Sequence, residues 1–281
     1  MKTLYVSDLD GTLLNSNTAL TDTTIETINA LVEEGMEFTF ATARSITSAS
    51  LVTRGLHLRT PLIVYNGVYL LDPDSHDILY SHSFTRQDAQ DILNYLLRHD
   101  MIPFVYSYID GRERVSYIEE GMHEGGKYYM ESRPYDKRFR KVDTTEQLLE
   151  GDVFYFTCIH DGSFLKPMYE YLEETTDYVI VFQQELYREE YWLEVMPRGV
   201  SKAQAILELK EKGGYDRVIS FGDAINDLPM FQISDECYAV GNAIEELKNT
   251  ATAVIGDHDA DAVAMWLKAN YQKKAGGSAS V

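Results

Sequence analysis

The chain has few of the features on which disulfide scaffolds, secretion signals and membrane spans depend. Its 281 residues include two cysteines, Cys158 and Cys237, which are too few for a disulfide framework and too far apart for a short-spaced zinc motif. The N-terminal residues reach Asp8 before an apolar run is long enough for a signal peptide, and no apolar run approaches the length of a membrane span. We therefore expect a soluble, cytoplasmic protein.

Positive charge is also scarce. The chain has 25 Lys and Arg against 45 Asp and Glu, a formal net charge of −20. Because nucleic acids and anionic membranes are bound through basic surfaces, this balance argues against both as partners. Hydrophobic residues make up 44% of the chain and charged residues 25%, which is typical of a folded globular protein. The oligomeric state is left open.

Short apolar runs alternate with helical patterns at both ends of the chain. Strands are expected at residues 4–6, 38–41, 62–65, 217–221, 238–240 and 253–255. Strands that alternate with helices indicate an α/β fold with a parallel sheet covered on both faces. We assign this core to two separate segments, residues 1–83 and 189–272, and expect residues 273–281 to form a flexible tail.

The order of predicted helices and strands changes in the middle of the chain. Helical spacing over residues 89–97 is followed by two strands around Asp110-Gly111, a pair typical of hairpin turns. Further strands at 153–159 and 178–184 flank a helical stretch at 165–172. This pattern predicts an α+β module inserted into the core over residues 84–188.

The first candidate site follows the first predicted strand. Asp8 and Asp10 are two residues apart, so in extended chain their side chains point to one side. They lie at the carboxyl end of a parallel strand, where open α/β sheets bind ligands. Paired carboxylates suit Mg²⁺, or a nucleophile beside an acid, and Gly11 would leave an amide facing a phosphate. Alone, this pattern is also typical of a solvated acidic turn.

A second acidic strand end supports the first. Asp223 and Asp227 follow the predicted strand at 217–221, and Asn226 lies between them. Their oxygens are suited to completing a Mg²⁺ site, although Asn and Asp are equally common in turns and helix caps. Thr42 follows the second strand and offers a hydroxyl to a phosphoryl oxygen, or an ordinary helix cap. Lys202 begins a helix, where the macrodipole disfavours a cation. This favours a functional role for Lys202, with an ordinary surface lysine as the alternative.

Taken in order, these motifs resemble the haloacid dehalogenase (HAD) superfamily. The motifs are Asp-Leu-Asp-Gly-Thr-Leu at 8–13, Ala-Thr-Ala-Arg at 41–44, Asn-Gly at 66–67, Gly-Val-Ser-Lys at 199–202 and Gly-Asp-Ala-Ile-Asn-Asp at 222–227. Within the superfamily the match is to the Cof-type phosphatases of class IIB. The resemblance covers nearly the whole chain and implies a Rossmann-like parallel-sheet core with an α+β cap domain at 84–188.

The resemblance also implies chemical roles. Asp8 would be the nucleophile of a phosphatase, and Asp10 the general acid that then activates water. Thr42 and Lys202 would hold the phosphoryl group, with Gly11 in support.

Mg²⁺ would be held by Asp8, by the backbone carbonyl of Asp10, and by Asp223, with Asp227 and Asn226 supporting it. Arg44 and Asn66 would help with substrate or phosphate contacts.

Two positions depart from the family pattern. Ala43 replaces the usual glycine and would add strain if that position needs a positive φ. Val68 replaces the usual alanine, a small change.

Several readings of function remain open. The leading prediction is a Mg²⁺-dependent phosphomonoester hydrolase acting through an aspartyl phosphate on a small metabolite, with sugar phosphates ahead of pyridoxal phosphate or a nucleotide. A response-regulator receiver domain also combines acidic residues with Thr and Lys, but it is far shorter and its acidic pair precedes a separate phosphoacceptor Asp. A phosphatase needs an acid two residues after its nucleophile, as Asp10 follows Asp8, whereas a stable phospho-switch does not. A catalytically quiet sugar-phosphate sensor that needs the metal is the remaining alternative.

Overall fold

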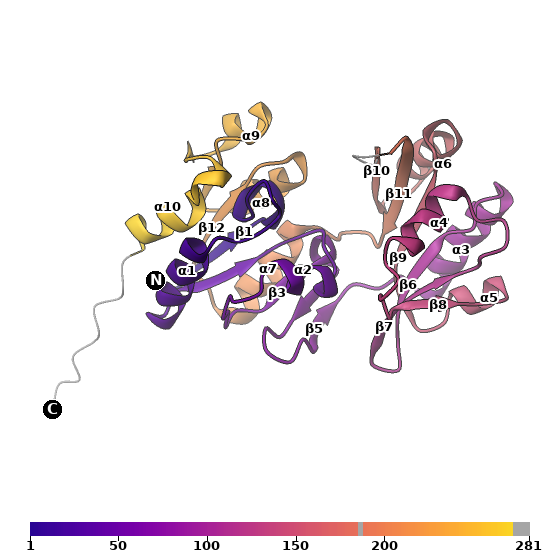
Figure 1. Ribbon diagram of the computed structural model, residues 1–281, viewed down its shortest axis with the longest axis horizontal. Helices are drawn as coiled ribbons and strands as arrows, with labels where there is room; N and C mark the ends of the chain where they lie inside the picture. Colours follow the sequence, from indigo (N-terminus) through magenta and orange to yellow (C-terminus); the bar gives the residue numbers. More distant parts are fainter. Residues whose placement is uncertain (185–187, 272–281) are drawn as a thin grey trace. The chain divides into compact units, whose positions relative to one another are not determined.

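The computed structural model describes residues 1–184 and 188–271, which form two compact units (Figure 1). The core unit comprises Met1–Ser81 and the described residues from Ser201 onward, and the cap unit is His82–Val200. The predicted insertion spans residues 84–188, whereas the cap unit continues to Val200 because the strand β11 (Glu190–Met196) pairs with two other cap strands. The predicted flexible tail, residues 273–281, lies outside the described residues.

The core unit alternates strands and helices along both of its segments. The first segment contains β1 (Thr3–Ser7), the turn η1 (Leu9–Leu13), α1 (Asp22–Glu33), β2 (Glu37–Phe40), α2 (Ile46–Val52), β3 (Leu62–Val64), η2 (Tyr65–Gly67), β4 (Tyr69–Leu71) and β5 (Ile78–Ser81). The second contains α7 (Lys202–Gly213), β12 (Arg217–Gly222), η3 (Ile225–Asp227), α8 (Leu228–Ile233), β13 (Glu236–Ala239), α9 (Glu245–Thr250), β14 (Ala253–Val254), η4 (His258–Ala260) and α10 (Ala262–Asn270).

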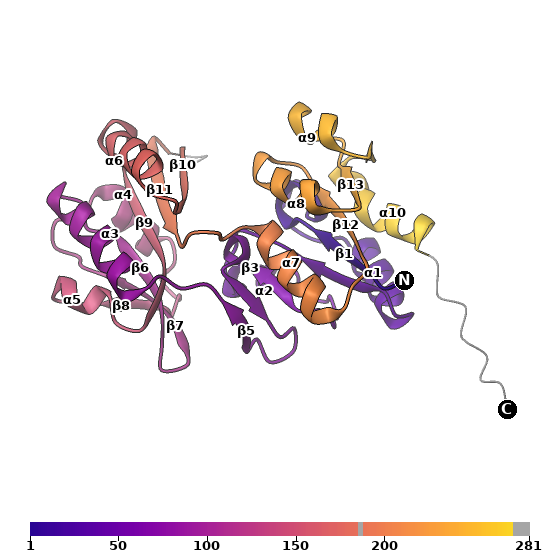
Figure 2. The same ribbon diagram turned by 180° about the vertical axis from the view of Figure 1, so that it is seen from behind.

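The core sheet has the strand order β14-β13-β12-β1-β2, and all of its pairings are parallel. The middle strands β1 and β12 are buried along almost their whole length, as expected for a parallel sheet with helices on both faces. Helices α1 and α10 pack together, as do α7 and α8, and Figures 1 and 2 show helices on both sides of the sheet. The predicted fold class is confirmed.

One predicted strand belongs to a separate small sheet. Strand β3 pairs antiparallel with β4, which pairs in turn with β5. A single bridge between Ala41 and Ile63 connects β3 to the end of β2. Strands β4 and β5 were not predicted from the sequence, and the turn at Asn66 and Gly67 separates them from β3.

The cap unit is a six-stranded sheet with the order β10-β11-β9-β6-β7-β8. Its elements are α3 (Arg86–Arg98), β6 (Phe104–Ile109), β7 (Arg112–Tyr117), α4 (Glu124–Glu131), β8 (Phe139–Lys141), α5 (Thr145–Leu148), β9 (Asp152–Asp161), α6 (Gly162–Thr175), β10 (Val179–Gln184) and β11. The expected hairpin around Asp110-Gly111 is confirmed by the antiparallel pairing of β6 with β7. The β7–β8 pairing is parallel, and the sequence analysis did not predict α4, α5 or β8.

The two faces of the cap sheet are covered differently. Apolar side chains of α3 and α6 pack on Phe156, Cys158 and Leu193 to form the cap's hydrophobic core. Side chains alternate along a strand, so Trp192, next to Leu193, faces the other side, where α4 lies. Among the described residues, no helix is long and apolar enough to cross a membrane.

Candidate active site

Three neighbouring strands of the core sheet end at one edge. Because β12, β1 and β2 are adjacent and parallel, the residues that follow them are brought together: Asp223 after β12, Asp8 after β1 and Thr42 just beyond β2. The amide of Asp8 donates to the carbonyl of Phe221 at 3.0 Å, which extends the strand pairing by one residue and fixes the start of the turn η1.

Asp8, Asp223 and Asp227 form a compact carboxylate cluster, in which one oxygen of each lies within 4.8 Å of the others. The ammonium of Lys202 donates to Asp8 and, at 2.7 Å, to Oδ1 of Asp227. Lys202 is only 2% exposed, although it is the first residue of α7, whose amino end is capped by Ser201. The predicted functional lysine is therefore a buried cation held between two carboxylates.

Burial and charge shift the ionisation of this cluster in opposite directions. Burial raises the pKa of Asp8 above its ordinary value, and the nearby Lys202 partly offsets this. Burial alone would lower the pKa of Lys202, but Asp8 and Asp227 raise it well above the ordinary value, so the ammonium stays charged. Burial also raises the pKa of Asp223, against a hydrogen bond from Thr12. A further positive charge at this site would therefore stabilise the ionised carboxylates.

Asp227 holds the loop after β12 in place. Its Oδ2 accepts hydrogen bonds from the amides of Asp223 at 3.0 Å and Ala224 at 3.1 Å, while its Oδ1 accepts from Lys202. A Cβ on Gly222 would lie 2.7 Å from Asp227 Oδ2, so this approach requires glycine. With its oxygens bound in this way, and the side chain fully buried, Asp227 positions Asp223 and Lys202.

Gly11 faces the second acidic strand end. It has a φ of +75°, and a Cβ there would lie 2.4 Å from Asp223 Oδ2. Two neighbouring contacts fix this turn: Thr12 Oγ1 donates to Asp223 Oδ1 at 2.8 Å, and Asn242 Nδ2 donates to the Gly11 carbonyl at 2.7 Å. Thr12 lies inside the first motif but was given no role from the sequence, and Asn242 belongs to no motif that could have identified it.

Asp10 lies apart from the carboxylate cluster. Its side chain is half exposed and receives two hydrogen bonds from Arg44, Nε to Oδ2 at 2.7 Å and Nη2 to Oδ1 at 2.6 Å. Arg44 Nη1 also donates to Ser48 at 2.9 Å, and the Arg44 amide donates to Thr42 Oγ1 at 3.1 Å. Hydrogen bonds through Arg44 thus connect Asp10 with Thr42, and both Thr42 and Arg44 are predicted phosphate-contact residues.

Asn66 and Asn226, the remaining candidate residues, make no hydrogen bond to the carboxylate cluster among the described contacts. Asn66 has a φ of +53°, and its buried Oδ1 has no hydrogen-bond partner among the described residues. Asn226 is exposed beside the cluster. Ala43 is not among the described residues with a positive φ, so the strain considered for this departure does not arise.

The donor set suits a hard cation. Asp8, Asp223 and Asp227 offer carboxylate oxygens, which Mg²⁺ prefers, and no sulfur ligand from the described residues takes part in the cluster. The hydrogen bond from Thr12 holds the Asp223 carboxylate in this cluster. The cluster therefore fits Mg²⁺, with the side chain of Asp10 outside the ligand group.

A family model described as haloacid dehalogenase-like hydrolase matches residues 5–267 of the chain. The chain belongs to this family. The predicted superfamily, and within it the Cof-type class IIB group, are confirmed. A crystal structure of a Thermotoga maritima protein is 25% identical, with a TM-score of 0.78 over 97% of this chain and 98% of that one.

Curated relatives fix the activity class. Pyridoxal phosphate phosphatase YbhA of Escherichia coli (strain K12) is 24% identical over 92% of this chain and 95% of its own length. A Bacillus subtilis (strain 168) phosphatase, named for 5-amino-6-(5-phospho-D-ribitylamino)uracil, is 23% identical over 94% of this chain and 96% of its own length. The predicted activity class, a phosphatase of this superfamily acting on small phosphorylated metabolites, is confirmed.

Proposed function

We propose that this phosphatase hydrolyses phosphomonoesters through an aspartyl phosphate formed on Asp8, with Mg²⁺ as cofactor. The observation that carries the proposal is the buried Asp8 carboxylate in contact with Lys202 and grouped with Asp223 and Asp227. A structural ion pair needs no third and fourth charge around it, whereas transfer of a phosphoryl group needs a nucleophile inside a cluster able to balance added negative charge.

In the first step an Asp8 oxygen attacks the phosphorus of the ester. The bond from phosphorus to the ester oxygen breaks, and the leaving oxygen takes a proton from Asp10, which the contact with Arg44 holds in place. Lys202 favours the ionised, nucleophilic form of Asp8 against the effect of burial. Thr42 and the amide of Gly11 bind the phosphoryl oxygens.

In the second step Asp10 takes a proton from water, and the water oxygen attacks the phosphorus of the aspartyl phosphate. The bond between phosphorus and the Asp8 oxygen breaks, which releases inorganic phosphate and restores Asp8. Asp8 and Asp223, with the backbone carbonyl of Asp10, would hold Mg²⁺, and Asp227 and Asn226 would support them. When bound, Mg²⁺ supplies positive charge that neutralises phosphoryl oxygens.

A sugar phosphate is our first candidate substrate. Pyridoxal phosphate is the second, and is supported by the relative named for that activity. We propose a cytoplasmic location with no nucleic-acid or membrane partner, as the acidic charge balance indicates.

The decisive experiment measures phosphate release from p-nitrophenyl phosphate and a panel of sugar phosphates, with Mg²⁺ or with EDTA. We expect turnover that requires Mg²⁺ in the wild type and is lost in Asp8→Asn. Asp74→Asn is the matched control, because Asp74 is an exposed acid of the same unit. A folded wild type that binds Mg²⁺ but releases no phosphate from any ester would favour the sensor hypothesis instead.

A further inference from the structure

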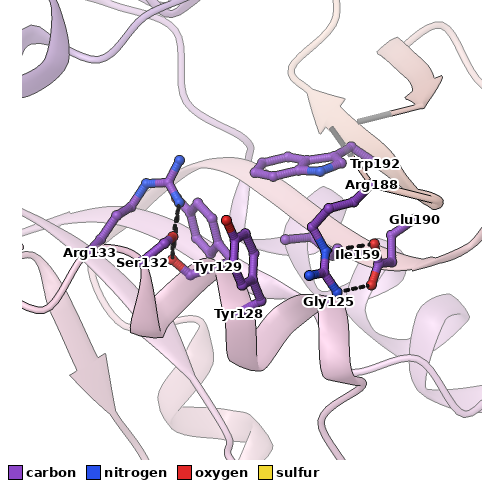
Figure 3. A pocket seen from close by; sticks show the side chains of 9 residues that line it. All are labelled: Gly125, Tyr128, Tyr129, Ser132, Arg133, Ile159, Arg188, Glu190 and Trp192. Atoms are coloured by element: carbon purple, nitrogen blue, oxygen red, sulfur yellow. Dashed lines mark hydrogen bonds and ion pairs between the residues drawn. The ribbon is translucent and has the colours of Figure 1, made fainter. Parts of the chain in front are cut away.

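The cap unit contains a pocket of about 440 Å³ that lies among its own elements (Figure 3). Helix α4 forms one wall, and strands β9 and β11 contribute the other. Its volume falls in the range of pockets that bind small molecules, about 300–1,000 Å³. None of the carboxylates or cations of the core unit takes part in it. Three aromatic rings and two arginines border it, an unusual composition in so acidic a chain.

Gly125 lets α4 approach the strands closely enough to build this wall. A Cβ on Gly125 would lie 2.8 Å from Ile159 Cγ2 and 2.9 Å from Glu190 Cγ. Glycine in a helix is destabilising by about 0.5–1 kcal/mol relative to alanine, and at this position the close approach offsets that cost. One turn later the helix presents Tyr128 and Tyr129 to the pocket.

The aromatic border of the pocket is held rigidly. Tyr129 is buried, and its hydroxyl is hydrogen-bonded to that of Tyr106 at 2.7 Å. The Trp192 indole packs against Tyr129 edge to face, at 5.1 Å between ring centroids and 88° between planes. In Figure 3 the indole lies across the pocket from the tyrosines of α4. Tyr128 is 50% exposed, which leaves part of its surface free for contact. A flat ring can stack on such surfaces.

The two arginines differ in their partners. Arg188 lies over the Tyr128 ring and makes two hydrogen bonds to Glu190, at 2.9 and 2.6 Å, so their charges offset each other. Arg133 lies 4.3 Å from the centroid of Tyr129 and donates to two neutral oxygens, the carbonyl of Tyr129 and the hydroxyl of Ser132. The nearby charge of Asp136 is felt by Arg133 but is already bound by Arg138. Among the described residues, Arg133 is therefore the pocket arginine without an ion-paired carboxylate, and it offers its charge to a ligand.

We propose that the cap pocket binds a planar, anionic ring, aromatic or heteroaromatic, that carries a carboxylate or phosphate group. The ring would stack beside Trp192 and Tyr128, and its anionic group would pair with Arg133. Two sources have this chemistry: the ring of a phosphorylated substrate, or a separate regulatory molecule. The binding proposal does not depend on the reaction assigned to Asp8.

The test is calorimetric titration of the full chain with 4-pyridoxate, a planar anionic ring, in the presence of EDTA. Pyridoxine has the same ring without the anionic group, and cyclohexanecarboxylate has the anion without the planar ring. We expect 4-pyridoxate to bind at least about tenfold more tightly than either. Arg133→Met should remove about tenfold of that affinity, because the charged pair is lost, and Tyr128→Leu should weaken it too.

Arg98→Met is the matched control, since Arg98 is an exposed arginine at the end of α3, on the opposite face of the cap sheet. Arg133 is also exposed, so its loss should leave the fold intact, and melting curves check this. Equal binding of the three compounds would overturn the proposal. So would 4-pyridoxate affinity that is unchanged in Arg133→Met, or no binding at millimolar concentration.

A second measurement separates the two sources. Phosphate release is followed from 4-pyridoxic acid 5′-phosphate, whose ring carries a carboxylate besides the phosphate, and from ring-free glycerol 2-phosphate, with Mg²⁺. If the ring belongs to the substrate, 4-pyridoxate inhibits competitively, and Arg133→Met raises KM for the ring ester relative to that for glycerol 2-phosphate. A regulatory ring binds without competing. Absence of phosphate release from either ester would count against the proposed reaction and leave the calorimetric result unaffected.

Discussion

Removing one carboxylate of the core cluster should abolish stabilisation by Mg²⁺. Asp223→Asn is the best perturbation, because an asparagine oxygen can still accept the hydrogen bond from Thr12 at 2.8 Å. In the wild type, Lys202 contacts Asp8 and Asp227, and Asp223 lies beside them, so with all three carboxylates ionised two negative charges are left uncompensated. The amide side chain removes one of these charges with little change in shape.

The expected size follows from mass action. Mg²⁺ at one hundred times its dissociation constant stabilises the folded protein by about 2.7 kcal/mol if it binds only to the folded state. For a protein of this size each kcal/mol shifts the melting temperature by about 2–4 °C, so the wild type should gain about 5–10 °C over the EDTA sample. Asp223→Asn should gain almost nothing and should melt no lower than the wild type in EDTA, because burial raises the pKa of Asp223 and already disfavours its charge.

Differential scanning calorimetry with titrated Mg²⁺ or with EDTA measures both effects. Asp74→Asn controls for the loss of an acidic side chain in the same unit and should respond as the wild type does. A full Mg²⁺ response in Asp223→Asn would show that Asp223 is not a ligand. A wild type that melts at one temperature in Mg²⁺ and EDTA would refute metal binding by the free protein.

Three further perturbations test other parts of the structure. Gly11→Ala should cost at least about 1 kcal/mol more than Gly214→Ala in urea unfolding, because both have a positive φ but only Gly11 would clash; equal costs would contradict this. Lys202→Met should destabilise the metal-free protein by about 3–5 kcal/mol, since it leaves buried carboxylates unpaired; a neutral effect in EDTA would refute the buried-pair description. Burial raises the pKa of Glu194 from 4.5 to about 7, so its folded form binds a proton more tightly than the unfolded chain, and stability should fall by up to about 3 kcal/mol as pH rises through this window. Glu194→Gln should remove this pH-dependent loss of stability. The measurement is the free energy of unfolding at pH 5 and pH 8, and an equal loss in wild type and variant would contradict the prediction.

The acidic half of the candidate site could be predicted from the sequence because it depends on local features. Asp8 and Asp223 each follow a short buried strand, and parallel strands bring their carboxyl ends to one edge of a sheet. The pairings made by Arg44 and Lys202 could not be predicted in this way. They join Asp10 to a residue 34 positions away and Asp8 to one 194 positions away.

The elements that the sequence analysis missed share a physical cause. Helix α4 contains Gly125 and Gly126, which are poor helix formers, and its stability depends on packing against β9. Strands β4 and β5 are three and four residues long, too short for a period of two to be evident. In both cases tertiary contacts, which propensity does not record, decide the local structure.

The charges around Lys202 support the proposed divalent metal. Lys202 contacts Asp8 and Asp227, and Asp223 lies beside them, so the ionised cluster has a surplus of two negative charges. One Mg²⁺ would balance that surplus, and a phosphate group, itself doubly charged, would then meet a site that does not repel it. In a chain with a net charge of −20, the metal would therefore be a condition for binding the substrate as well as for the chemistry that follows.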